Sequence, residues 1–66
     1  MILLKKEKNV MLSYIKTAHR DLELATNRFN ELTDDDAIDY ASYNLMAARA
    51  KYAYLMRLAK EEGLTV

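Results

Sequence analysis

Apolar residues recur in this chain at spacings of three and four, and this periodicity constrains the fold more than any other feature. In the first half, one stripe comprises Leu4, Met11, Ile15, Ala18, Leu22, Ala25, Phe29 and Leu32, with Lys8 filling the gap after Leu4. From Met11 onward the steps alternate between four and three, which places these side chains on one face of an α-helix. The first half is therefore predicted to be one amphipathic helix over about 4–32.

The second half carries two apolar stripes on opposite faces of a single helix. The first stripe comprises Ile38, Ala41, Leu45, Ala48, Tyr52, Leu55 and Ala59. The other stripe, which we call the second face, lies half a turn away and comprises Tyr40, Tyr43, Ala47, Ala50, Tyr54 and Leu58. A helix that is apolar on opposed sides is usually sandwiched between two neighbours. We expect the first helix to bury one stripe, so the second face needs another partner.

A short polar segment separates the two helices. Leu32-Thr33-Asp34-Asp35-Asp36 interrupts the periodicity, and the Thr33 hydroxyl can cap the second helix by accepting from the Asp36 amide. The aspartates would then lie in the first turn, where the positive end of the helix dipole favours anions. Gly63 can adopt a positive φ and end that helix.

The predicted architecture is all-α. It is a single helical hairpin over 1–66, with a turn at about 33–34 and a second helix at about 34–62. The two helices should be antiparallel, because short links place consecutive helices antiparallel. Two rods enclose no interior, and a domain of this size buries only about 60% of its unfolded surface even when compact. We therefore expect two hairpins to assemble into a four-helix bundle homodimer. Two-fold symmetric dimers are the commonest homo-oligomers. The tyrosines of the second face would anchor that contact.

The amino-acid composition excludes several classes of protein. The chain has 66 residues with one glycine and no proline, which indicates one domain of long helices. Cysteine is absent, so disulfides and thiolate metal sites are excluded. The longest apolar run is far shorter than the ~18 residues of a membrane span. Met1-Ile2-Leu3-Leu4 precedes its lysines, the reverse of a signal peptide, so a cytoplasmic protein is expected.

No residue pattern indicates catalysis. Asp34, Asp35 and Asp36 could hold a divalent ion, but they lack the spaced ligands and central glycine of a calcium loop, and helix capping is favoured. His19 can pair with Glu23 four residues later, without a nucleophile or metal to serve. A tyrosine phenol, with a reference pKa of ~10, needs strong tuning to act as an acid near neutrality, so core and interface roles are favoured for the tyrosines. We predict no catalytic, cofactor-binding or metal-binding residue, and no enzyme.

Basic residues are dispersed among acidic ones. Lys5, Lys6 and Lys8 lie near the start and Arg49, Lys51, Arg57 and Lys60 lie along the second helix, diluted by Glu7, Glu61 and Glu62. The formal net charge is zero, whereas a nucleic-acid-binding domain more often has a pI above about 9 and one basic face. Direct binding of nucleic acid is disfavoured. Ile2-Leu3-Leu4 with the lysines would also anchor only weakly to an anionic membrane.

The stretch 29–64 reads FNELTDDDAIDYASYNLMAARAKYAYLMRLAKEEGL. It resembles the YaaL-like family of small Gram-positive bacterial proteins, whose pattern is close to FN-x-x-T-D-x-D-x-I-D-Y-A-x-Y-x-L-x-A-A-x-x-x-Y-x-Y-L-x-x-x-A-K-x-x-G. Ser42 departs from it, since the family often has an aliphatic residue there. That family is a domain of unknown function, so the resemblance implies no activity. Its genes often lie near a recombination-repair gene, which implies a loose link to DNA metabolism or sporulation.

The functional prediction follows from the unpartnered second face. We expect a small non-enzymatic protein–protein interaction module, acting in oligomerisation or as an adaptor, that forms a homodimer and binds an unidentified protein. The alternative is a nucleic-acid-associated accessory protein linked to DNA repair or sporulation. Steeply salt-dependent DNA binding would favour the alternative.

Overall fold

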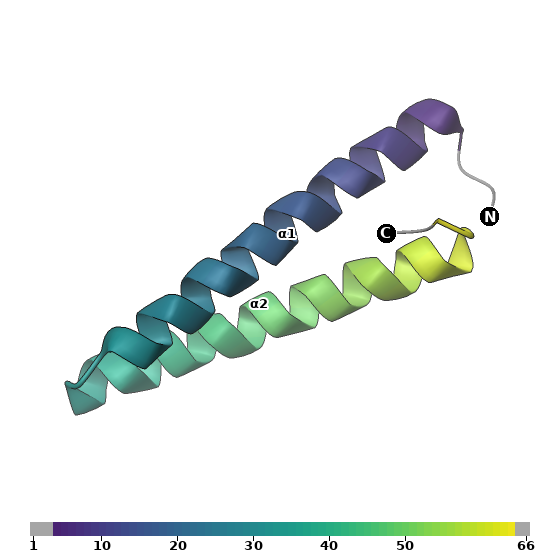
Figure 1. Ribbon diagram of the computed structural model, residues 1–66. Coiled ribbons are helices and arrows are strands. Elements are labelled where there is room, and N and C mark those ends of the chain that lie inside the picture. The colour runs from purple at the N-terminus through teal and green to yellow at the C-terminus, as the bar shows by residue number, and fades with distance from the viewer. Residues whose placement is uncertain (1–3, 65–66) are drawn as a thin grey trace.

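The computed structural model describes residues 4–64, which form two helices, α1 (Lys5–Glu31) and α2 (Asp35–Glu61). Figure 1 shows them packed as a hairpin, with the start of α1 and the end of α2 at one end and the link at the other. The long dimension is 46 Å, close to the ~40 Å expected for a helix of this length. No strand occurs within residues 4–64, so the predicted all-α class is confirmed.

Both helices are one residue shorter at each end than the ranges predicted from periodicity. Helix ends of this kind vary by one or two residues with the criterion used. The predicted apolar start lies mostly outside the described residues, because only Leu4 of Met1–Leu4 is described, and Leu4 is exposed.

The core is a single seam between α1 and α2. Its buried residues are Ile15, Ala18, Ala41, Leu45 and Ala59, and all five belong to the stripes predicted to face each other. Most other members of those stripes are half-buried, whereas Leu4 and Leu32 at the ends of the α1 stripe are exposed. No polar or charged residue of the described chain is buried. The seam therefore depends on apolar packing alone.

The start of α2 differs from the prediction in its capping residue. Asp34, not Thr33, is the N-cap, and its Oδ1 accepts a hydrogen bond of 2.9 Å from the Asp36 amide. Asp34 has the extended backbone of an N-cap, with φ −82° and ψ 128°. Its carboxylate carries the negative charge that the positive helix end favours, so it caps at least as well as a threonine hydroxyl.

The end of α2 follows the prediction for Gly63, whose φ is +74°. The Gly63 amide donates to the Lys60 carbonyl at 3.1 Å, and the Leu64 amide donates to the Ala59 carbonyl at 2.9 Å. This pair of bonds is the Schellman motif, which needs a residue at positive φ. At the start of α1, Glu7 Oε1 accepts from the Leu4 amide at 3.3 Å, which is one half of a capping box.

Candidate functional site

The second face of α2 is uncovered along almost its whole length. Tyr40, Tyr43 and Tyr54 are 72%, 76% and 53% exposed, and Ala47 and Ala50 are exposed between them. Four of them, Tyr43, Ala47, Ala50 and Tyr54, lie away from the side of α2 that packs on α1, and Tyr40 lies at the edge of the face. Tyrosine combines a large apolar ring with a polar hydroxyl, and such groups are enriched where one protein meets another. Contiguous apolar surface of this kind usually marks an interface.

Leu58 is the member of the predicted set that departs from the others. It is half-buried and lines a hollow between the helices, near the start of α1 and the end of α2. The lining residues are Lys6, Glu7, Val10, Met11 and Tyr14 of α1 and Leu55 and Leu58 of α2. Leu58 lies about 40° around α2 from Tyr54 at 100° per residue, toward this hollow. It therefore forms one edge of the second face.

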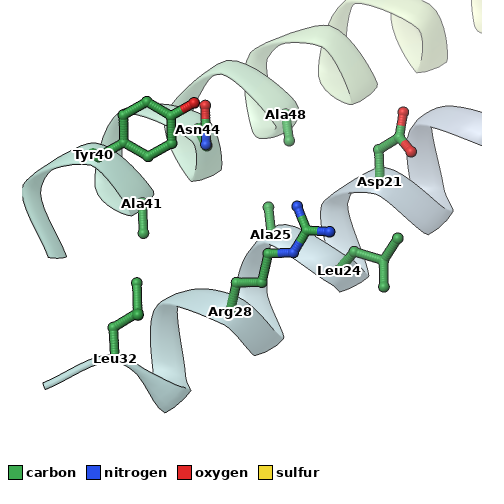
Figure 2. Close-up of a pocket in the computed structure, with 9 residues that line it drawn as sticks. All are labelled: Asp21, Leu24, Ala25, Arg28, Leu32, Tyr40, Ala41, Asn44 and Ala48. Carbon is green, nitrogen blue, oxygen red and sulfur yellow. The ribbon is translucent and has the colours of Figure 1, made fainter. Parts of the chain in front are cut away.

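A second hollow lies closer to the link between the helices. Figure 2 shows its lining, which comprises Asp21, Leu24, Ala25, Arg28 and Leu32 with Tyr40, Ala41, Asn44 and Ala48 of α2. Alanines line it where the two helices face each other, and the polar groups come from Asp21 and Arg28 of α1 and from Asn44 and the Tyr40 hydroxyl of α2. Tyr40, 72% exposed, belongs both to this hollow and to the second face. The hollow is thus an open groove at the edge of the second face.

Both hollows lie on the same flank of the hairpin. Glu7, Tyr14, Asp21 and Arg28 succeed one another at intervals of seven residues, so they lie in one row along α1. The first two line one hollow and the last two line the other. On α2, Ala48 and Leu55 show the same seven-residue relation. Sequence reasoning missed this groove because it exists only when the flanks of two helices are placed together.

The predicted pair of His19 and Glu23 is present, with 3.4 Å between Nδ1 and Oε1, and both side chains are exposed. The His19 ring also lies 5.5 Å from the ring of Tyr52, centroid to centroid, at an interplanar angle of 56°. Tilted aromatic pairs at this distance are favourable packing contacts between elements. His19 therefore joins α1 to α2 across the edge of the seam, a contact that depends on the alignment of the helices and was not predicted.

The acidic segment at the link serves the helix start. Asp34 is the N-cap, and Asp35 and Asp36 occupy the first turn of α2. Within residues 4–64 no three His, Cys, Asp or Glu side chains are grouped so that they could hold a metal ion. The same residues contain no buried side-chain nitrogen or oxygen that lacks a hydrogen-bond partner. None of the described helices is long and apolar enough to cross a membrane.

One comparison with known proteins gives a match. A family model described as a protein of unknown function (DUF2508) matches residues 2–66. Comparisons with curated proteins and with solved structures give no match. The family description brings no ligand, activity or site residue, so a function has to be argued from the surface of the hairpin.

Proposed function

Because the chain belongs to the DUF2508 family, whose function is unknown, we propose its role from its surface: a small non-enzymatic interaction module. In this proposal two hairpins associate through the second face of α2, and the assembly acts as an oligomerisation unit or adaptor for another protein. The observation that carries the proposal is the row of exposed tyrosines on a helix whose other side forms the seam.

The exposed area of the isolated hairpin supports self-association. The chain has 5440 Å² of accessible surface, whereas a compact monomer of 7.7 kDa would have about 4300 Å². The excess is roughly 1100 Å², and a standard interface buries about 800 Å² on each partner. A second copy could therefore cover the surplus surface without any rearrangement of the hairpin.

The proposal also includes the cellular location of the protein and the form of its assembly. The resemblance of 29–64 to the YaaL-like proteins of Gram-positive bacteria supports a bacterial, cytoplasmic protein, and the two-helix seam leaves a four-helix assembly as the simplest dimer. The alternative role, as a nucleic-acid accessory factor, gains no specific support. Arg28 lies one heptad from Asp21 on the same row, and Lys6 lies beside Glu7, so the groove flank has mixed charge.

The test is the molar mass in solution, measured by light scattering coupled to size exclusion over a micromolar concentration series. We expect about twice 7.7 kDa for the parent chain. The Ala47→Glu variant should be monomeric but still helical, because it introduces an unpaired charge into the contact without touching the seam. Asn27→Glu is the matched control, since Asn27 is exposed on α1. A parent chain that stays monomeric, or an Ala47→Glu variant that assembles like the parent, contradicts the proposal.

A further inference from the structure

The central residues of the second face of α2 have the same order of residue types from either end of the helix. These residues are Tyr43, Ala47, Ala50 and Tyr54, at successive spacings of four, three and four. The order from either end is tyrosine, alanine, alanine, tyrosine. The midpoint of this pattern lies between Ala47 and Ala50, close to the middle of α2 (Asp35–Glu61).

A face with this symmetry fits a second copy of itself that runs the opposite way. A two-fold axis through the midpoint brings Tyr43 of one copy level with Tyr54 of the other, and Ala47 level with Ala50. Each contact then occurs twice, as in any isologous interface. The alanines at the centre let the two backbones approach closely, and the tyrosine pairs close both ends of the contact.

Antiparallel pairing also brings complementary residues together along both edges of the second face. Tyr40 and Leu58 are 18 positions apart, as are Asp39 and Arg57, and 18 residues make about five full helical turns. Each pair therefore lies on one edge of α2, near opposite ends. Antiparallel pairing places Tyr40 against Leu58 of the other copy along the groove edge. Along the other edge it places Asp39 against Arg57 of the other copy.

Charge thus separates the two possible orientations. Arg57 already lies at the second face, with its guanidinium carbon 5.9 Å from the centroid of its own Tyr54 ring. Parallel pairing would instead set this edge against the opposite edge of the other copy, so Asp39 would lie near Tyr40 and Arg57 near Leu58, and neither charge would gain an opposite charge. Antiparallel pairing opposes Asp36 to Glu61 at the two ends, but both are exposed, and solvent and salt screen such charges.

From this pattern we propose that the protein dimerises by antiparallel pairing of α2 with α2 of a second copy, held by Tyr43–Tyr54, Ala47–Ala50 and Asp39–Arg57 contacts. The inference rests on the proposed function, because it specifies the orientation and residue pairs of that self-association. It places the two α1 helices on the outside of the assembly, with the α2 helices adjacent at its centre.

Charge reversal tests the paired edge. Asp39→Arg alone and Arg57→Asp alone should each weaken the dimer by about tenfold, because each brings two like-charged pairs together. The double variant restores the opposite charges and should recover the parent dissociation constant. Both reversals also disfavour α2 through its dipole, so a purely helical effect would make the double variant weaker than either single one. Arg20→Asp, at an exposed position on α1, is the control and should leave dimerisation unchanged.

A distance measurement tests the orientation directly. The chain has no cysteine, so a nitroxide on Lys60→Cys is the only label, and Lys60 is exposed near the end of α2. Antiparallel pairing about the midpoint predicts about 35 Å or more between the two labels, whereas parallel pairing predicts about 20 Å or less. A dimer with the short distance, or without rescue by the double reversal, overturns the orientation and leaves the proposed function standing. A monomeric parent overturns both.

Discussion

The two faces of α2 are built from similar residues and have opposite environments. Ala41, on the seam, is 5% exposed, and Tyr40 beside it is 72% exposed. Both faces carry alanine and tyrosine in steps of three and four. What separates them is α1, whose single stripe can cover only one side of α2. Apolar character therefore does not decide which face is buried, and a helix with two such faces inside a hairpin has one left over.

The largest expected effect comes from adding a charge to the seam. Ala18, on the α1 side of the seam, is 1% exposed, and Ala18→Glu would bury an unpaired carboxylate, which should cost at least about 3 kcal/mol. For a hairpin with so few buried residues we expect most of the helicity to be lost, as measured by circular dichroism. The same substitution on the second face, Ala47→Glu, should keep helicity and lose association. If Ala18→Glu remains as helical as the parent, the distinction between the seam and the second face is wrong.

Removal of apolar volume from the seam should have the next largest effect. Leu45 is 7% exposed, and Leu45→Ala should reduce the free energy of unfolding by about 2–5 kcal/mol. Its neighbour Met46 is 63% exposed, so Met46→Ala should cost less than about 1 kcal/mol. Urea unfolding at one fixed protein concentration compares them, because dimer stability depends on concentration. Equal losses would mean that the seam does not carry the stability.

The start of α2 should contribute a smaller amount. Asp34→Ala removes the observed N-cap hydrogen bond and should cost about 1 kcal/mol. Thr33→Ala should cost no more than about 0.5 kcal/mol, because Thr33 is exposed and outside the cap. Thermal unfolding of the two variants gives the order. A larger loss for Thr33→Ala would restore the original prediction for the cap.

The smallest effect is expected on the polar side of α1. Asn27 is exposed, and Asn27→Glu should change the unfolding free energy by less than about 0.5 kcal/mol. Molar mass and unfolding should both match those of the parent chain. A clear loss of association would show that α1, as well as α2, contributes to the contact between copies.

The seam could be predicted from the sequence because it depends on periodicity within each helix. The three/four spacing around Ile15 and Leu45 places those residues on one face whatever the other helix does, and both are buried. The N-cap could not be fixed, since Thr33, Asp34 and Asp35 are consecutive residues that can each cap a helix. The contact of His19 with Tyr52 and the groove beside Leu58 depend on how far one helix is shifted along the other, which no single stripe specifies.

The absence of buried polar groups from the described part of the seam affects how α1 and α2 are aligned along each other. A polar residue at such a position normally opposes sliding of one helix along another, since a shift would leave it unpaired. No residue between 4 and 64 has that role, because none that is polar is buried. A slide by one heptad is about 10 Å. The link from Leu32 to Asp34 spans at most about 14 Å from helix end to helix end, so it would have to be fully extended to allow that slide across the ~9 Å between the helix axes. The link itself is exposed, yet it sets the register of the whole hairpin, and a longer flexible link would admit several registers in place of one.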